Sequence, residues 1–361
     1  MGTVSWPEGI EARSIDTGDA DAWAELLAAK EKIDQEGENY GPQDLLDVLN
    51  DPHLDAALDT IGLWAEGRMV AYGKAHAAES VIDVDRVRTD GTVHPQWRRR
   101  GVGTALMHWL IERAAELHAV KHPDVPGEVG NSAISTNIGA DRLLQKFGFE
   151  ECRYFFDMKR PLDEPVAEVP VAARLRLVPF DMSMDEALRA THNEVFLDHW
   201  GSTPKDEESW KIEVTGARAF RGGSSYLVLD GETIAAYVLG YEWEADTAVT
   251  GIKELYIGYL GTRRSHRGRG LARAALAKVL TEAAHSPVSG CRAWRGRRQP
   301  DRRTWTVREP RLLGAQQVGH LPAAALNRAN TDCASEKSWT ALTMPGGCRR
   351  SIGARNLLVD S

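Results

Sequence analysis

Apolar residues follow the same order of patterns in each half of the chain. Runs of β-branched and aromatic residues at 81–87 and 252–260 are typical of strands. After each run comes a segment whose apolar residues recur at helical spacing, 105–117 in the first half and 271–284 in the second. The hydrophobic pattern therefore predicts a strand, a turn and a helix in each half.

Turn residues and a polar linker divide the chain into segments. Alternating apolar residues on both sides of Asp230-Gly231 predict a hairpin at 225–240, with a similar case at 62–73. Residues 161–170 are rich in proline and acidic side chains, as linkers often are, and a new strand pattern begins at 174. We therefore expect a first unit at 1–160, a linker at 161–173, a second unit at 174–285 and a tail at 286–361.

The turn between strand and helix is basic and contains glycine in both halves. Its residues are Arg98, Arg99, Arg100, Gly101, Val102 and Gly103 in the first half and Arg267, Gly268, Arg269, Gly270, Leu271 and Ala272 in the second, at a constant offset of 169 positions. Glycine lets the backbone approach a ligand closely, and the amides at a helix N-terminus attract anions. One copy alone is equally compatible with a tight turn whose arginines are solvated. The repeat favours a pyrophosphate site in each half.

These turns resemble the acetyl-CoA-binding signature of the GNAT N-acetyltransferase superfamily, as RxxGxG in the first half and RxxGxA in the second. The segment 137–149 is similar to the family's NxxA…L…GF element, and the whole resemblance covers about residues 10–285. It implies an α/β (α+β) fold of two tandem GNAT domains, each a mixed, curved sheet flanked by helices, whose central strands separate to admit the pantetheine arm of acetyl-CoA. Beside the two turns, the resemblance assigns Val93, Asn137, Leu260 and Thr262 to the cofactor site.

The charge of the chain changes near residue 286. All 361 residues together have 44 Lys and Arg against 52 Asp and Glu, a net charge of −8. Residues 286–361 have 13 basic and five acidic side chains, so they carry +8 and residues 1–285 carry −16. An acidic body argues against nucleic-acid binding by the arginine turns and favours steering of an anionic cofactor.

The tail at 286–361 shows no helical or strand periodicity, and we expect it to be irregular. Its bias toward Arg, Pro, Ala, Gly, Trp and Cys is typical of GC-rich coding DNA read out of frame. When the codons are displaced by one nucleotide, Trp294 to Leu312 can read GVDADNPTGAxGLYExRGF, which is similar to the segment 137–149. The pattern indicates an incomplete second domain followed by a frameshifted tail. An authentic basic, disordered tail that touches nucleic acid is the alternative.

Acetyl transfer from a thioester to an amine needs one group that takes a proton from the amine and another that protonates the leaving thiolate. The resemblance places the general base at Glu254, acting through water, and the same strand position of the first half holds Asp85. A solvated strand carboxylate is the alternative for both. The family's usual thiolate acid is a tyrosine, but its position holds Leu144 in the first half and Val307 in the second. We therefore expect the first unit to bind acetyl-CoA without catalysing well and the second to lack its acid.

An acceptor site is expected at 196–201, in the first helical region of the second unit. This segment resembles one in tandem GNAT proteins of the mycothiol synthase type, and Asp198, His199 and Trp200 can line the pocket. Helix packing and capping explain these three residues equally well. His94 and His266 flank the arginine turns and are expected to be exposed turn residues rather than catalysts.

The sequence thus predicts an acyltransferase, an acetyl-CoA-dependent N-acetyltransferase that acts on the primary amine of a small molecule. A catalytically impaired acetyl-CoA-binding module and a mycothiol synthase-like enzyme are the alternatives. No two cysteines have metal-ligand spacing, no apolar run reaches about 18 residues, and the first ten residues lack a basic segment followed by an apolar one. We expect no metal, no nucleic-acid or membrane partner, and a cytoplasmic location. The sequence gives no indication of the oligomeric state.

Overall fold

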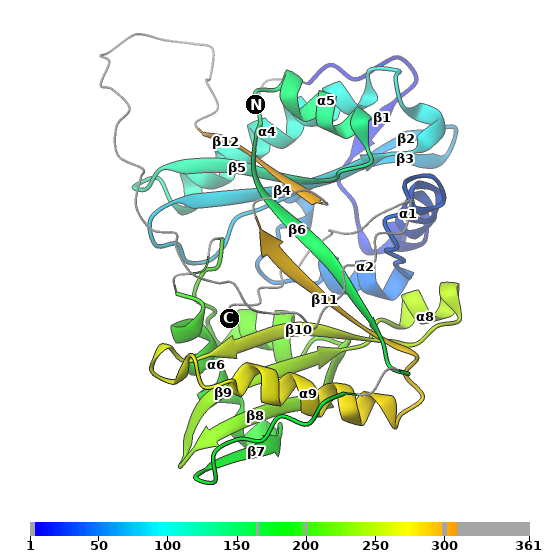
Figure 1. The fold of residues 1–361 in the computed structure, drawn as a ribbon. Coiled ribbons are helices and arrows are strands. Elements are labelled where there is room, and N and C mark those ends of the chain that lie inside the picture. The colour runs from blue at the N-terminus through cyan, green and yellow to red at the C-terminus, as the bar shows by residue number, and fades with distance from the viewer. Residues whose placement is uncertain (1–3, 164–165, 198, 200, 298–301, 309–361) are drawn as a thin grey trace.

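One continuous sheet of twelve strands runs through the molecule, in the order β1-β2-β3-β4-β5-β12-β6-β11-β10-β9-β8-β7 (Figure 1). The computed structural model describes residues 4–163, 166–197, 199, 201–297 and 302–308. No helix among these residues is both long and apolar enough to cross a bilayer. They also contain no cluster of His, Cys, Asp and Glu suited to a metal ion.

The first unit is a sheet with helices on both faces. Its strands are β1 (Glu11–Arg13), β2 (Thr60–Ala65), β3 (Arg68–His76), β4 (Asp85–Val93) and β5 (Gly127–Ile134). Its helices are α1 (Ala20–Asp34), α2 (Pro42–Leu49), α3 (Ala56–Asp59), α4 (Val102–Lys121) and α5 (Ile138–Lys146), with short 3-10 turns η1 (Thr17–Asp19) and η2 (Pro95–Trp97). Apolar residues of α4 and of the sheet form one core, and those of α1 and α2 pack on the opposite side.

The second unit repeats this arrangement. Its strands are β7 (Leu175–Pro179), β8 (Phe220–Asp230), β9 (Thr233–Tyr241) and β10 (Glu254–Thr262). Its helices are α6 (Asp185–Val195), α7 (Glu207–Trp210), α8 (Glu244–Thr250) and α9 (Leu271–Ala284), with 3-10 turns η3 (Met182–Met184) and η5 (Arg264–His266) and a π-helical turn η4 (Lys211–Thr215). α9 covers one face of the sheet, and α6 packs with α7 and η4 on the other. The part of the sheet in each unit contains parallel and antiparallel pairs and is flanked by helices, which confirms the predicted fold class.

Both predicted hairpins are present. β2 and β3 are joined by Glu66-Gly67, both with positive φ (52° and 74°), as a two-residue type I′ turn requires. β8 and β9 pair around the turn that contains Gly231, whose φ is 62°. In both units the sequence pattern therefore located the second antiparallel pair of the sheet correctly.

The two central parallel strands of each unit separate after four residues. β4 pairs with β5 only from Asp85 to Arg88, and β10 pairs with β11 (Gly290–Arg297) only from Glu254 to Ile257. These stretches occupy equivalent positions, because each residue of the second lies 169 positions after its counterpart. The separation of the central strands that the family resemblance implied is therefore present in both units.

Three strands between the units complete the sheet. β6 (Glu150–Pro161) leaves the first unit and pairs through residues 154–161 with β11, and β12 (Arg302–Arg308) pairs with both β5 and β6. Figure 1 shows β6 crossing from the upper to the lower half of the molecule beside β11. The two units are therefore joined by backbone hydrogen bonds as well as by the linker.

β11 and β12 correct one expectation from the sequence. The chain was expected to be irregular after residue 285, but the described residues include strands at 290–297 and 302–308. The edge of β10 offers backbone donors and acceptors that a following segment can satisfy without a periodic pattern. Cys291 and Ala293 (1% and 7% exposed) also fill the core beneath α9. Residues 309–361, where the rest of the expected tail lies, are outside the described part of the chain.

Candidate active site

The two arginine turns have the same backbone geometry. Each ends with a left-handed glycine before its helix, Gly101 (φ 83°) before α4 and Gly270 (φ 73°) before α9. Two residues earlier, Arg99 (φ 65°) and Gly268 (φ 75°) are also left-handed. A left-handed conformation costs a non-glycine residue about 1 kcal/mol, so the first turn keeps this shape against local strain.

Matching side-chain contacts reinforce this equivalence. Arg98 Nε donates to the carbonyl oxygen of Val93 at 3.2 Å, and Arg267 Nε donates to that of Thr262 at 3.3 Å. Each arginine therefore closes its turn onto the last residue of the preceding strand. The first amides of α4 and α9 are the ones that an α-helix leaves without an intrahelical partner, so both turns present donors suited to a phosphate.

Access to the two turns differs. A Cβ added at Gly268 or at Gly270 would meet no atom of the described residues within 4 Å. At Gly101 it would meet Pro7 Cγ at 3.8 Å, because residues 4–7 lie beside this turn. The second turn therefore fits a diphosphate on its backbone with open space, whereas the N-terminal segment partly covers the first.

Two polar contacts further tie down the first turn. The Arg98 guanidinium forms a bidentate ion pair with Asp34 of α1 (2.7 and 2.6 Å), and Asn137 Nδ2 lies 3.4 Å from the same carboxylate. Asn137 Oδ1 accepts from the Ala140 amide at 3.0 Å and so caps α5. Arg98 and Asn137, both predicted to bind the cofactor, thus have structural partners in this unit.

A side chain also bridges the gap between the separating strands of the first unit. Asn131 of β5 donates through Nδ2 to the carbonyl oxygen and to Oγ1 of Thr89 on β4, both at 3.1 Å. Thr89 Oγ1 in turn donates to the Gly130 carbonyl at 2.9 Å. The opening that would admit a pantetheine arm is therefore closed by hydrogen bonds at this point.

The other predicted cofactor residues lie around the turns. Val93 packs on the core beneath α4, and the Arg100 guanidinium lies over the Trp97 ring at 4.8 Å from its centroid. Leu260 and Thr262 are buried on β10 (each 4% exposed), and Leu271 begins the core-facing side of α9. Arg99, Val102, Gly103, Arg269 and Ala272 complete the two turns.

A β-bulge makes the two central strands differ. The register between β10 and β9 shifts between Ile257 and Tyr259, whereas β4 pairs with β3 without a shift. The extra residue is Gly258, where an added Cβ would lie 1.9 Å from a ring carbon of Tyr241. A bulge rotates the strand, so residues before it change faces relative to a regular strand.

This rotation separates Asp85 from Glu254, which the offset of 169 places at one strand position. Asp85 shares the face of β4 that packs on α4, and its carboxylate is wholly buried against His118 of that helix (Oδ2 to Nδ1, 2.8 Å). Glu254 lies on the opposite face of its own sheet, with Tyr256. The prediction of a solvated carboxylate is therefore wrong for Asp85, which packs inside the first unit.

Glu254 lies between two cations. Its Oε2 accepts from Arg292 Nη1 of β11 at 2.9 Å, and its Oε1 is 3.7 Å from Lys159 Nζ of β6. It stands at the start of β10, beyond the wall of the cavity described next. Its proposed role as general base therefore requires a water molecule or a movement of these partners.

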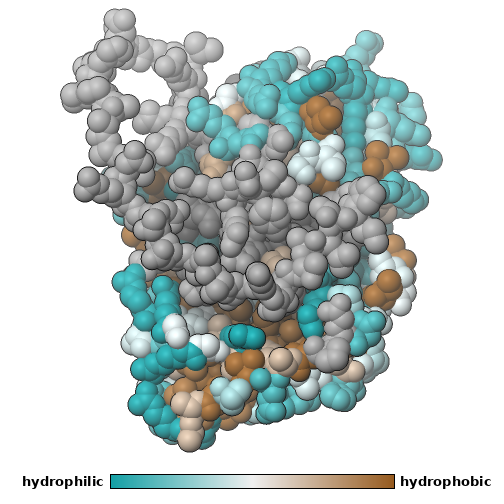
Figure 2. Space-filling model, in the orientation of Figure 1, coloured by the Kyte–Doolittle hydropathy of each residue, from teal (hydrophilic) through white to brown (hydrophobic). Residues whose placement is uncertain are grey.

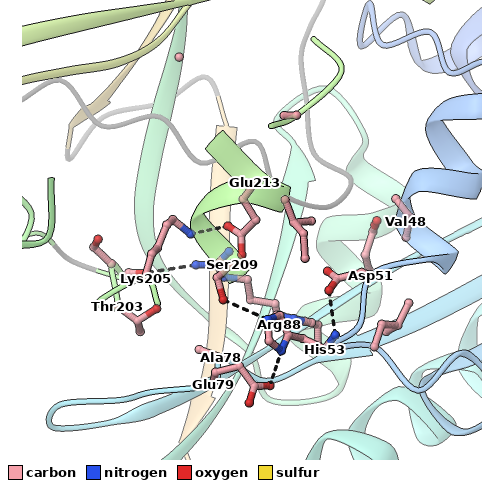
Figure 3. Close-up of a pocket in the computed structure, with 18 of the residues that line it drawn as sticks. Val48, Asp51, His53, Ala78, Glu79, Arg88, Thr203, Lys205, Ser209 and Glu213 are labelled. Atoms are coloured by element: carbon pink, nitrogen blue, oxygen red, sulfur yellow. Dashed lines mark hydrogen bonds and ion pairs between the residues drawn. The ribbon is translucent and has the colours of Figure 1, made fainter. Parts of the chain in front are cut away.

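A cavity of about 910 Å³ lies between the two units (Figure 3). Its wall includes Thr89 and Asn131 from the first strand separation and Tyr256, Gly258 and Tyr259 from the second. The lining has nine carboxyl groups and five Lys or Arg side chains, so it is polar with an excess of acid. Such a cavity suits a small, polar, cationic molecule.

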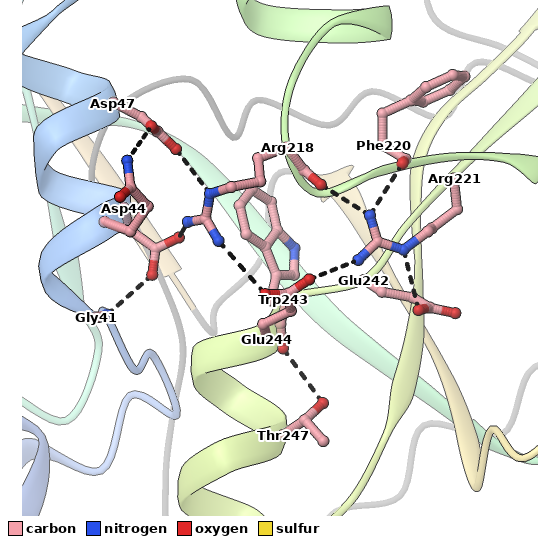
Figure 4. A network of polar contacts seen from close by, with 11 residues as sticks. Gly41, Asp44, Asp47, Arg218, Phe220, Arg221, Glu242, Trp243, Glu244 and Thr247 are labelled. Carbon is pink, nitrogen blue, oxygen red and sulfur yellow. Dashed lines mark hydrogen bonds and ion pairs between the residues drawn. The ribbon is translucent and has the colours of Figure 1, made fainter.

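Contacts between the units hold the cavity in shape. His53 Nε2 of the first unit and Ser209 Oγ of the second lie 3.2 Å apart in its wall, and Arg88 Nη2 donates to the Gly201 carbonyl at 3.1 Å. At another edge, Arg218 forms ion pairs with Asp44 and Asp47 of α2 (Figure 4). Figure 2 shows hydrophilic residues along the outer rim of the upper half of the molecule.

Glu213 is a cavity residue that the sequence pattern did not reveal. It lies on the π-helical turn η4, a rare geometry that often occurs at functional sites, and it pairs with Lys205. Burial opposes ionisation of Glu213, but Lys205, Arg88 and His76 outweigh it, and the pKa of the carboxyl is lowered. An acidic residue followed by an aliphatic one is common in sequences, so nothing in the sequence marks Glu213 as a functional residue.

The remaining predicted residues are placed as follows. His199 is buried (9% exposed) and lines the cavity, while Asp198 and Trp200 lie outside the described residues. Leu144 is in the core of the first unit, and Val307 lies in β12 opposite Val129.

The two turn histidines were expected to be exposed, and the structure shows them more enclosed. His94 is half-buried and caps η2 through Nδ1. The His266 side chain is only 13% exposed, and its Nε2 lies 3.1 Å from Asp230. Both side chains thus stabilise the turns locally.

Comparison with known proteins agrees with this geometry. Residues 60–151 match the model of an acetyltransferase (GNAT) domain, and residues 185–304 match that of the acetyltransferase (GNAT) family. The chain is 28% identical to mycothiol acetyltransferase of Parafrankia sp. over 60% of its length and 62% of the relative's. It is 30% identical to mycothiol acetyltransferase of Saccharomonospora viridis over 67% of its length and 72% of the relative's. The first of these alignments spans less than two thirds of the relative.

Solved structures share the fold. A GCN5-related N-acetyltransferase from Sphaerobacter thermophilus has a TM-score of 0.65 at 22% identity, covering 84% of this chain and 97% of that one. A tandem GNAT protein from the clavulanic acid biosynthesis pathway has a TM-score of 0.61 at 17% identity, covering 83% and 98%. With a GNAT match in each unit and a relative that is 30% identical over two thirds or more of both chains, this chain belongs to the GNAT acetyltransferase family and contains two GNAT domains.

Proposed function

We propose that the protein transfers an acetyl group from acetyl-CoA to the primary amine of a small molecule, and that the second unit carries out the reaction. One observation carries this proposal. The open turn at Gly268 and Gly270 follows β10, whose separation from β11 borders the cavity between the units at Gly258 and Tyr259. A cofactor on the turn and an acceptor in the cavity would therefore meet at the same strand.

The turn of the second unit would hold the cofactor. The first amides of α9 would bind its diphosphate, with Arg267 and Arg269 steering the anion toward an otherwise acidic protein. The bound cofactor supplies an activated acetyl thioester. In the first unit the Arg98–Asp34 pair, the Asn131 bridge and residues 4–7 argue for a mainly structural turn.

Two carboxylates of the second unit would bind and deprotonate the amine. Glu213 faces the cavity and keeps its charge because its pKa is lowered, so it is suited to bind an ammonium group and ill suited to accept a proton. Glu254, on the face of β10 that continues into the cavity wall, would take the proton through water. Binding and deprotonation are thus assigned to different residues.

A mycothiol acetyltransferase-like activity is the second candidate. It rests on the names of the relatives and on His199, which the sequence analysis placed in the acceptor pocket and which lines the cavity. A module that binds acetyl-CoA without turnover is the third, favoured by Leu144 and Val307 at the positions of the family's tyrosine.

Thiol release from acetyl-CoA, measured against a panel of primary amines, separates these proposals. We expect turnover by the wild type, a raised KM for the amine in Glu213→Gln, and a lowered kcat in Glu254→Gln with a shifted pH profile. The matched control is Glu208→Gln, an exposed residue on the neighbouring α7. Binding of acetyl-CoA without turnover of any amine would favour the third candidate.

A further inference from the structure

Four ionisable side chains line one face of the β3–β4 pair in the first unit. Lys74 lies directly opposite Asp90, and His76 directly opposite Arg88. Because residues two apart share a face of a strand, all four point the same way, and all four line the cavity between the units. None of these four side chains is assigned to cofactor binding or to proton transfer in the acetyl transfer proposed above.

Lys74 is buried and has no direct partner, and burial lowers the pKa of its amino group. It is 8% exposed, and it forms no hydrogen bond or ion pair with the described residues. The Asp90 carboxylate across the strand accepts instead from the Tyr72 hydroxyl at 2.9 Å. Burying an ammonium group without acceptors is costly, so the three N–H donors of Lys74 are placed for an oxygen atom that the chain does not supply.

The surroundings of His76 indicate the sign of the charge on the group that Lys74 would bind. Burial, together with the charges of Lys74, Arg88 and Lys121, lowers the pKa of His76 to about 3 against the opposing effect of Glu213. The imidazole is therefore neutral at physiological pH in a positive local potential. A negative group beside it would be attracted to both Lys74 and Arg88.

The carboxylates near Lys74 already have partners of their own. Burial raises the pKa of Asp90, while Lys74, Lys30 and the Tyr72 hydroxyl lower it. Asp51 Oδ1 accepts from the His53 amide at 2.9 Å. Neither carboxylate occupies the donors of Lys74, which stay available on the cavity side.

We propose that Lys74, His76 and Arg88 form an oxyanion subsite in the first unit, which takes a carboxylate or phosphate group of a small molecule in the cavity. Glu213 lines the same cavity, so the acceptor would carry an ammonium group and an oxyanion in one molecule; this extension rests on the proposed function. The first unit would then select the acceptor, and the second would acetylate it.

Binding of simple anions tests the subsite without any turnover. Titration calorimetry with inorganic phosphate and, separately, with succinate decides which oxyanion is preferred. We expect saturable binding of at least one of them, weakened at least tenfold in Lys74→Met and largely restored in Lys74→Arg. Lys278→Met, at a half-exposed position on α9 that pairs with Glu282, is the control that should bind as the wild type does.

A second readout keeps the test valid if Lys74→Met folds poorly. In the wild type, an anion at the subsite should shift the ring resonances of His76 in NMR spectra and raise its pKa. No shift with either anion, or equal binding by well-folded Lys74→Met, would overturn the proposal.

Kinetics separate this inference from the proposed function. Amines that carry a carboxylate or phosphate should have a KM at least tenfold below that of uncharged analogues, and Lys74→Met should remove the difference. Anion binding without amine turnover would leave the subsite standing and refute the acetyl transfer. Turnover indifferent to the anionic group would refute the subsite alone.

Discussion

Replacing Gly258 by alanine should disturb the bulge that orients the start of β10. The added Cβ would lie 1.9 and 2.2 Å from two ring carbons of Tyr241, far inside van der Waals contact. Tyr241 is 4% exposed and packs against the rings of Phe220 and Tyr259, with centroids 5.6 and 6.4 Å away. These two rings restrict how far the Tyr241 ring can turn, so we expect the strand itself to shift.

The expected loss of stability is about 3 kcal/mol, the upper end of the range for overpacking a close-packed core. Tyr241→Ala alone should cost about 4 kcal/mol as a large-to-small change. If the clash causes the effect, Gly258→Ala should cost less than about 1 kcal/mol in the Tyr241→Ala background. The two substitutions should therefore show a coupling energy of about 2 kcal/mol.

Urea unfolding followed by circular dichroism measures these differences. Gly223→Ala is a matched control, because Gly223 is an exposed glycine of β8 whose Cβ would meet no described atom within 4 Å. It should unfold within about 0.5 kcal/mol of the wild type. A Gly258→Ala protein as stable as the control, or additive effects in the double variant, would refute the contact with the Tyr241 ring as the reason that this bulge position requires glycine.

Three further predictions concern buried ionisable groups. His118→Ala leaves the Asp85 carboxylate buried without its partner and should cost about 3 kcal/mol in urea unfolding, whereas the exposed control His285→Ala should cost less than about 0.5. Burial lowers the pKa values of His76 and His192 to about 3, so their neutral forms stabilise the fold fully above the unfolded pKa near 6.5. Stability should fall by about 1.4 kcal/mol per pH unit for each histidine as the pH drops from 6.5 toward 3. Unfolding midpoints are compared between the wild type and a His76→Gln/His192→Gln variant. Wild-type midpoints that do not change with pH over this range would contradict this prediction. Burial raises the pKa of the Cys291 thiol to about 12, so a thiol reagent at pH 8 followed by mass spectrometry should label exposed Cys152 but label Cys291 only after unfolding.

The features that the sequence predicted depend on local patterns. Hairpins, the strand–turn–helix repeat and the glycines before α4 and α9 are each encoded within a few residues. The 169-residue repeat then located equivalent backbone positions correctly in both units, including the point where the central strands separate. Local sequence patterns and the internal repeat were therefore sufficient to predict the fold class and the positions of both turns.

The features that the sequence missed depend on contacts between distant segments. One extra residue at Gly258 reverses the face of Glu254, and a glycine inside a strand pattern is the only sign of it. Glu213, Lys74 and Arg88 meet in a cavity that exists only when the two units are packed together. β11 and β12 form because neighbouring strands offer backbone hydrogen bonds, which composition does not reveal.

The stoichiometry of acetyl-CoA binding, measured by titration calorimetry, tests the central claim most directly. The open second turn predicts one acetyl-CoA per chain, with binding weakened at least tenfold by Gly270→Val and little changed by Gly251→Val, which places the same side chain at the left-handed glycine that ends α8, before the start of β10 and at the opposite end of this strand from the turn. Two equivalent sites per chain, or binding that survives Gly270→Val but is lost in Gly101→Val, would contradict the assignment of the reaction to the second unit.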